Sequence, residues 1–280
     1  MTSPQLEKSD YGEISLKRNP TSPRTLFGLV MSGIAGLFTL AAIIPLLIIL
    51  SYLITKGVSS LSAAVFTELP PPPLVDGGGF GNAILGTVLM VGIGALISIP
   101  LGIMAAIYLS EFNEGKVAEW IRFATNVLSG VPSIIVGVFA YGVIVLTFKS
   151  YSAWAGGFAL SILMLPIIVR TTDESLKLVP QDVRQASVGI GANQYQTVLQ
   201  VVLPAALPAI ITGITLAIAR AAGETPPLLF TALFTQFWPN WDALLVEPTA
   251  SLAVLVYNFA IVPFKNQQEL AWGAAFILVM

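Results

Sequence analysis

The sequence contains no cysteine and no histidine among its 280 residues. The lack of cysteine excludes disulfides and thiolate metal sites. The lack of histidine removes the commonest metal ligand and the commonest general acid or base, so zinc binding and histidine-based catalysis are not expected. The sequence also lacks a GxxxxGK[ST] loop, which excludes ATP hydrolysis of the P-loop type. We therefore predict no catalytic residue, no metal and no cofactor, and we predict that the chain is not an enzyme.

Charge is scarce as well, because charged residues make up only 10% of the chain while hydrophobic residues make up 55%. Soluble domains carry about 25% charged residues. A chain this apolar cannot hide its hydrophobic surface in one soluble core, so membrane lipid is the expected surrounding. The formal net charge of -2 gives no reason to expect a nucleic-acid partner. These properties predict an all-α protein that crosses a membrane several times.

Apolar segments long enough, or nearly long enough, to span a bilayer occur five times. A sixth begins near residue 270, and we expect it to be truncated, because its twelve residues rise only about 18 Å against a hydrocarbon core of about 30 Å. A polar N-terminal tail, residues 1–25, has no layout of a cleavable signal and precedes a predicted membrane domain over 26–280. The five predicted spans are 26–54, 82–109, 126–147, 155–169 and 203–222.

The distribution of lysine and arginine predicts that the N-terminus is cytoplasmic. With that orientation, nine basic residues lie in inner segments and three in outer ones, which is the bias typical of inner-membrane proteins. The inner ones are Lys8, Lys17, Arg18, Arg24, Lys116, Arg122, Arg170, Lys177 and Arg184, and the outer ones are Lys56, Lys149 and Lys265.

Prolines interrupt the predicted spans at Pro45, Pro100, Pro132 and Pro166. A proline removes one helical hydrogen bond and often bends the helix, so kinks are expected at these positions. The proline and glycine run over 69–81 predicts an irregular connection on the outer side.

A polar segment, residues 170–204, separates the fourth and fifth spans. Pro180 favours a helix start and Gly191 a helix end, which predicts one short helix between them. A second short helix is expected over 193–203, where apolar residues recur at helical spacing. The segment is either an ordinary surface loop or a docking element for a partner's groove.

This segment resembles the loop of bacterial ABC importer permeases that reads E-A-A, three residues, G, nine residues, I-x-L-P. The chain has Gln185-Ala186-Ser187, then Gly191 at the same spacing, and Val201-Val202-Leu203-Pro204. Glutamine replaces the glutamate, so an ion pair made from that position in the family is not expected here. The resemblance implies a coupling helix that fits a cleft on a cytoplasmic ATPase subunit. The residues it implicates are Asp182, Arg184, Gln185, Ala186, Ser187 and Gly191.

Four further stretches are similar to the phosphate-specific branch of these permeases. The resemblance implies a MetI-like permease fold in a bacterial inner membrane, with inorganic phosphate as substrate. It also implies a PstC-type permease subunit, an ATP-binding cassette ATPase dimer and an extracytoplasmic phosphate-binding protein as partners. The stretches are GGFGNAILGT (78–87), LSGVPSIIVGVF (128–139), LPIIVRTTDESLKLVP (165–180) and ARAAGETPPLLFTAL (219–233).

Arg220 and Glu224 stand four residues apart in an otherwise apolar region. The intervening and following residues, GETPP, predict a helix break, and more apolar sequence follows. Either Arg220 reaches the headgroups at the outer rim, or it lines a substrate path. Arginine binds phosphate oxygens bidentately, and a glutamate on the same helix face offsets the cost of the cation. Thr225 and Ser133 are further candidates for the path, although Ser133 equally well bonds to its own helix.

Other functions compatible with these observations are a permease of another oxyanion importer, of the molybdate or sulfate type, and a secondary transporter. Secondary transporters often carry several intramembrane carboxylates or histidines, whereas only Glu224 is found here. A membrane scaffold without transport activity leaves Arg220 unexplained.

Overall fold

The computed structural model describes residues 22–112, 115–243 and 246–280, and within these ranges the chain is helical and forms no strand. Two compact units are distinguished, Met1–Tyr52 and Leu53–Met280. The helix α1 (Pro23–Ser59), which belongs to the first unit up to Tyr52 and to the second from Leu53, is apolar and passes through Pro45 without a break. Its large apolar side chains are exposed from Leu26 to Ile49. Lipid acyl chains are a suitable cover for such a surface, since every backbone group is already bonded within the helix.

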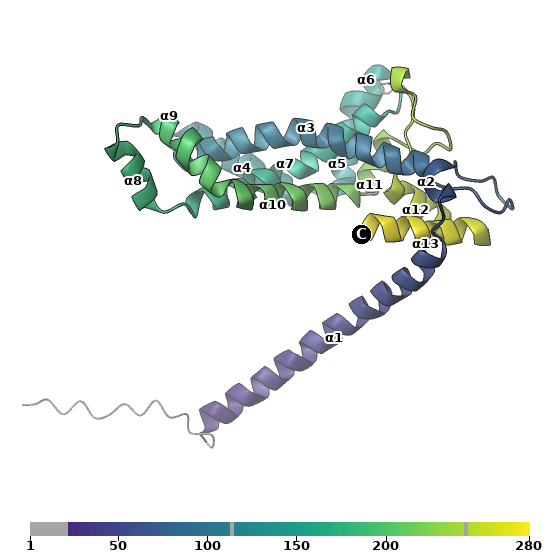
Figure 1. Ribbon diagram of the computed structural model, residues 1–280, viewed down its shortest axis with the longest axis horizontal. Helices are drawn as coiled ribbons and strands as arrows, with labels where there is room; N and C mark the ends of the chain where they lie inside the picture. Colours follow the sequence, from purple (N-terminus) through teal and green to yellow (C-terminus); the bar gives the residue numbers. More distant parts are fainter. Residues whose placement is uncertain (1–21, 113–114, 244–245) are drawn as a thin grey trace, which may run out of the picture. The chain divides into compact units, whose positions relative to one another are not determined.

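The second unit is organised around the contact between α3 (Gly81–Glu111) and α7 (Ala153–Lys177) (Figure 1). Glycines bring the two helices together: a Cβ at Gly94 would lie 3.1 Å from the carbonyl oxygen of Gly157, and one at Gly102 would lie 2.7 Å from Cγ2 of Ile168. Because the contacts advance together along both helices, α3 and α7 run in the same direction. Small residues at such contacts are the usual basis of helix packing in membranes.

The helix α10 (Leu203–Ala222) packs against the same pair and runs antiparallel to α7. Its contact is closest at Gly213, where a Cβ would lie 2.3 Å from Oγ1 of Thr171. Further along, Ala217 joins Met90 of α3 and Leu160 of α7 in one buried cluster. The three helices α3, α7 and α10 thus form the core of the second unit.

The predicted third span is strongly bent. It consists of α4 (Lys116–Gly130) and a second helical stretch formed by α5 (Ser133–Ala140), the π-turn η1 (Tyr141–Val145) and α6 (Leu146–Phe148). The two halves meet at an angle of 107°. Pro132 stands at this bend as the residue that precedes α5, whereas Pro100 and Pro166 lie inside unbroken helices. Proline alone therefore does not determine where these spans break.

The polar segment, residues 170–204, contains both predicted helical stretches. Only the first of them is a separate helix. The helix α8 (Gln181–Gly189) ends just before Gly191, as expected. Residues 194–202 are helical as predicted, but the expectation of a separate short helix was wrong: α9 (Gln194–Thr197) continues through the π-turn η2 (Val198–Val202) into α10. Pro204 lacks an N–H group, and the wider π-turn in front of it accommodates that loss without ending the helix.

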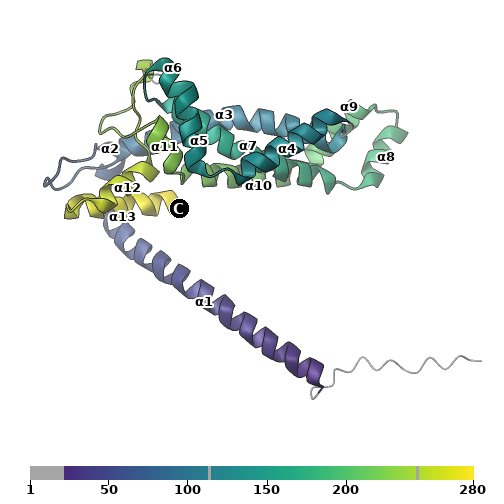
Figure 2. The same ribbon diagram turned by 180° about the vertical axis from the view of Figure 1, so that it is seen from behind.

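Shorter helices complete the second unit. They are α2 (Ala64–Thr67), α11 (Pro226–Thr231), η3 (Trp241–Ala243), α12 (Leu252–Ile261) and α13 (Lys265–Val279). Both views place α8 and α9 at one end of this unit and α2, α12 and α13 at the other (Figures 1 and 2). By length and composition, four helices of the described residues can cross a membrane, or five if the bent pair counts as one span.

The close contact of α3 with α7 predicts a specific sensitivity to added volume. A Cβ at Gly157 would lie 2.5 Å from Cγ2 of Ile93, so Gly157→Ala should destabilise the folded protein by about 1–3 kcal/mol. The control is Gly92→Ala on α3, where nothing lies within 4 Å of an added Cβ. Thermal unfolding in detergent measures both; equal midpoints for the two variants would contradict the packing described here.

Candidate functional site

Arg220 and Glu224 lie side by side at the end of α10. The guanidinium Nε is 3.7 Å from Oε1 of Glu224, and the arginine side chain is 62% exposed while that of the glutamate is 16% exposed. At this separation, and with one partner so exposed, the ion pair contributes little to stability. The guanidinium therefore keeps donor groups available on its exposed side.

The helix break predicted at GETPP is confirmed. The helix α10 ends at Ala222, and Thr225 directly precedes α11, in which Pro226 and Pro227 fill the first two positions. Proline is well accommodated there because the first N–H groups of a helix have no intrahelical partner. The helix is thus interrupted next to the Arg220–Glu224 pair.

The short helix α11 rests directly on α5. A Cβ at Gly137 would lie 2.6 Å from Cα of Pro227, so the two backbones touch. Ser133, the first residue of α5, is one turn before Gly137, and Thr225 is two residues before Pro227; both are half-buried. The bend at Pro132 and the break at GETPP are consequently neighbours, and the two predicted hydroxyl residues flank their contact.

Arg220 lies two helical turns beyond Gly213, the residue of α10 that packs on Thr171 of α7. Two turns correspond to about 11 Å along the helix axis. Thr171 adjoins Arg170, where the apolar part of α7 ends. The exposed side of α10 that carries Arg220 mixes small residues with large apolar ones, namely Ala205, Ala209, Thr212 and Ala219 with Leu207, Ile211 and Leu216.

At the opposite end of the second unit, the residues predicted for coupling divide into two groups. Asp182, Gln185 and Ala186 are exposed on α8. Ser187 is buried, and its hydroxyl group lies 2.9 Å from that of Thr197. Arg184 is also largely buried, with a side chain 14% exposed, and it bonds within its own chain.

Sequence reasoning missed the apolar part of this surface, which consists of Val188 and Ile190; they are 58% and 88% exposed. It also missed Glu111, the last residue of α3, which forms an ion pair with Arg184. Glu111 could have been noticed in the sequence, because it is an acidic residue at the end of an apolar span.

The turn between α8 and α9 depends on two local features. Gly191 has a φ of +96°, a conformation that disfavours residues with a Cβ. Asn193 then starts α9 with a capping box, in which it exchanges 2.9 Å hydrogen bonds with Gln196. The pattern Asn-x-x-Gln was a readable signal for this helix start.

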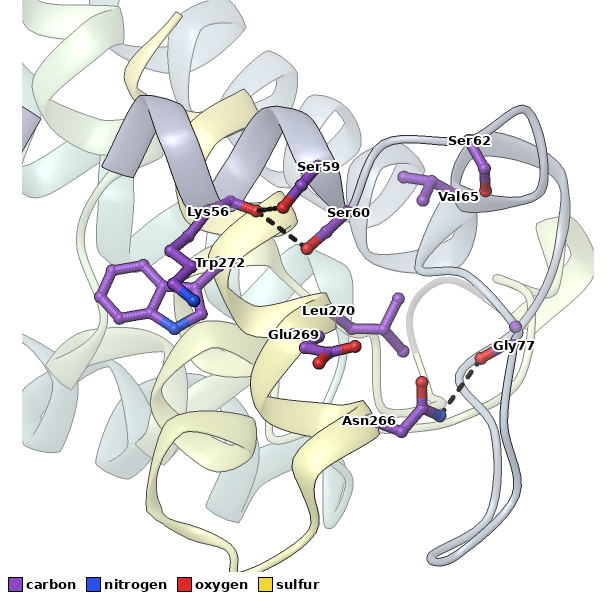
Figure 3. Close-up of a pocket in the computed structure, with 11 residues that line it drawn as sticks. Lys56, Ser59, Ser60, Ser62, Val65, Gly77, Asn266, Glu269, Leu270 and Trp272 are labelled. Atoms are coloured by element: carbon purple, nitrogen blue, oxygen red, sulfur yellow. Dashed lines mark hydrogen bonds between the residues drawn. The ribbon is translucent and has the colours of Figure 1, made fainter. Parts of the chain in front are cut away.

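A polar pocket of about 400 Å³ lies elsewhere, between the end of α1, the proline and glycine loop, and α13 (Figure 3). Asn266 of α13 donates to the carbonyl oxygens of Val75 and Gly77 at 2.5 and 3.3 Å and so fixes the loop. Lys56 and Glu269 also line this pocket. None of the residues predicted for the substrate path or for coupling is among its lining residues.

The arrangement described above is that of a multi-pass inner-membrane permease. The family described as "Binding-protein-dependent transport system inner membrane component" matches residues 98–264. The chain is 43% identical to the phosphate transport system permease protein PstA of Yersinia pestis, over 81% of this chain and 76% of that protein. It is 41% identical to PstA of Haemophilus influenzae, over 90% of this chain and 88% of the relative.

Among solved structures, inward-facing MetNI, a methionine ABC transporter, matches with a TM-score of 0.54 and 19% identity, over 71% of this chain and 85% of the other. That similarity confirms the predicted MetI-like permease fold. The chain belongs to the binding-protein-dependent permease family, and within it to the PstA group of ABC transporter permeases. Its relatives are permease subunits rather than enzymes.

The turn at Gly191 yields a prediction that separates backbone conformation from side-chain volume. An added Cβ meets nothing within 4 Å at either Gly189 or Gly191, but only Gly191 has a positive φ. Gly191→Ala should therefore cost roughly 1–2 kcal/mol of local stability, whereas Gly189→Ala should be neutral or stabilising. Hydrogen exchange of amides 181–193 should accelerate only for Gly191→Ala; acceleration in both or neither would refute this account of the turn.

Proposed function

We propose that this chain is a transmembrane permease subunit of a phosphate ABC importer and forms one half of its translocation pathway. The observation that carries the proposal is Arg220, a permanent cation on the exposed side of α10 beside a helix break. The names of its relatives, phosphate transport permeases, support phosphate as the substrate.

The depth of Arg220 favours a role in the substrate path rather than contact with the outer headgroups. The apolar part of α7, Ala153 to Val169, corresponds to about 25 Å of helix. Arg220 lies about 11 Å outward from the level of Thr171, the inner end of that stretch. The guanidinium thus starts well inside the apolar layer. A charge there costs about 2.5–3.5 kcal/mol on insertion scales unless protein or water surrounds it.

The chemistry of the site suits an oxyanion. A guanidinium presents paired N–H donors at the spacing of phosphate oxygens and does not deprotonate. Glu224 offsets the charge when no anion is present, and its loose contact with Arg220 lets an anion replace it. It also keeps binding weak enough for release, which a conduit requires. Thr225 and Ser133 are proposed to supply hydroxyl groups to the same path, where irregular backbone lines a cavity.

A second permease, of the PstC type, is proposed to cover the exposed side of α10. The apolar residues exposed on this side, small ones such as Ala209 and large ones such as Leu216, suit packing against another helix, and a partner there encloses Arg220 away from lipid. The two permeases together would form the pathway, open in turn to either side as ligand and nucleotide shift the equilibrium between states.

The exposed surface of α8 is proposed to dock on one subunit of a cytoplasmic ATPase dimer. Asp182, Gln185 and Ala186 lie on this surface, and Val188 and Ile190 add apolar area suited to a groove. In keeping with this orientation, the tail, residues 1–25, is proposed to be cytoplasmic and 26–280 to be the membrane domain, with the coupling loop over 170–204. An extracytoplasmic phosphate-binding protein is then proposed to deliver substrate from the other side.

Replacing Arg220 tests the pathway. In vesicles that contain the complete importer, Arg220→Gln should lower ATP-dependent phosphate uptake at least tenfold, because the neutral amide cannot hold a phosphate dianion or monoanion. Arg220→Lys should retain an intermediate rate, since it keeps the charge but not the paired donors.

The matched control is Lys265→Gln, which removes an equally loose i,i+4 pair with Glu269, at 3.9 Å. Undiminished uptake by Arg220→Gln would refute the pathway role. Competition of molybdate or sulfate with phosphate would instead support another oxyanion importer, and uptake without ATP would support a secondary transporter.

Docking of α8 is tested by adding bulk where the isolated chain has room. Ala186 is exposed, so Ala186→Trp should leave the fold intact but block a complementary groove. We expect the ATPase to be lost on affinity purification of the complex. The control is Ile261→Trp, at an exposed position on α12 at the other end of the unit. Full retention of the ATPase by Ala186→Trp would contradict the proposed docking surface.

A further inference from the structure

The side chain of Arg184 does not point toward a partner but into its own subunit. It forms an ion pair with Glu111, in which the two side chains are 14% and 8% exposed. Its Nη2 donates to the carbonyl oxygen of Leu176 at 2.7 Å, and its Nε is 3.5 Å from that of Val179. All three guanidinium nitrogens therefore have an acceptor within the chain.

These bonds join elements that are far apart in sequence. Arg184 belongs to α8 and Glu111 closes α3, while the Leu176 carbonyl lies in the last turn of α7. Gln194, the first residue of α9, donates to the backbone oxygen of Glu111 at 2.9 Å. The neighbouring rings of Phe112 and Tyr195 lie 5.2 Å apart. The ends of α3 and α7, the start of α9 and the middle of α8 thus meet at one largely buried ion pair.

We infer that the Arg184–Glu111 pair is a clamp that makes α8 move as one body with the inner ends of α3, α7 and α10. Arg184 is then a positioning residue, and its role is to transmit displacement of α8 to the membrane helices rather than to contact the ATPase. The inference deepens the proposed coupling function and rests on it for its consequence in transport.

The physical basis is the burial of the pair. Removing one partner of a buried ion pair leaves the other charge without solvent or counterion, which is unfavourable, whereas an exposed pair is easily exchanged for water. The same guanidinium also satisfies a carbonyl group at the C-terminus of α7, where basic groups are favoured by the helix dipole. A displacement of α8 relative to α3 would break all of these interactions at once.

A distance measurement tests the clamp directly. The chain has no cysteine, so Met104→Cys on α3 and Gln181→Cys on α8, both exposed and outside the proposed docking surface, give two spin-label sites in the full complex. We expect one narrow distance distribution that is the same without nucleotide and with a non-hydrolysable ATP analogue. In Glu111→Gln, which keeps the shape and removes the charge, it should broaden. If the distance changes with nucleotide while Arg184 and Glu111 are both unaltered, the clamp is refuted.

Transport supplies the second readout. Arg184→Ala and Glu111→Gln should keep the ATPase bound and hydrolysing ATP, while phosphate transported per ATP falls at least fivefold. The double variant Arg184→Glu/Glu111→Arg should recover at least half of the ratio. Arg170→Ala, which removes an exposed pair with Glu174 on the same part of α7, should leave it unchanged.

The outcomes separate the two proposals. Loss of the ATPase in Arg184→Ala but not in Glu111→Gln would mean that Arg184 contacts the partner, and an unchanged ratio in both would equally refute the clamp. If the unaltered complex transported no phosphate, the proposed function would fail, while the spin-label distances would still decide whether α3 and α8 move together.

Discussion

The close contact of α3 with α7 is the constraint on which the rest of the second unit depends. Glycine at 94, 102 and 157 lets two parallel helices approach until side chains touch backbone, a distance that no larger residue allows. This pair gives α10 a surface to pack on, and the contact of Gly213 with Thr171 then sets the height of Arg220. Because α3 and α7 also end together, Glu111 and the Leu176 carbonyl are brought to one point.

Two arginines of this framework are held in opposite ways. Arg220 is 62% exposed and loosely paired, so its charge is available to a mobile anion. Arg184 is 14% exposed and has an acceptor for each nitrogen, so its charge interacts with groups of its own chain. The difference follows from the neighbours: Arg220 lies on the exposed side of α10 beside a helix break, whereas Arg184 faces three converging helix ends. The same residue type is thus proposed to serve ligand chemistry in one place and holds the fold together in the other.

Much of this could be read from the sequence, and the failures have physical causes. The apolar spans, the short helix before Gly191 and the break at GETPP were predictable, since they follow from local composition and from proline and glycine chemistry. The continuity of α9 with α10 was not, because a π-turn accommodates Pro204 and leaves no mark in hydrophobic periodicity. The burial of Arg184 depends on Glu111, a residue 73 positions away. Contacts of that kind come from the tertiary arrangement, which no local pattern encodes.

The π-turn at Val198–Val202 also fixes an angular register. A π-turn contains one residue more than the α-helical turn it replaces, so every later side chain is rotated by about 100° around the axis relative to an uninterrupted α-helix. The direction in which the cation of α10 faces is therefore set some twenty residues earlier, near the start of the continuous helix. Loss of a single residue from this turn would convert it into an ordinary α-turn and keep that cation on its present side, whereas substitutions that turned it α-helical at constant length would swing the cation toward a different neighbour.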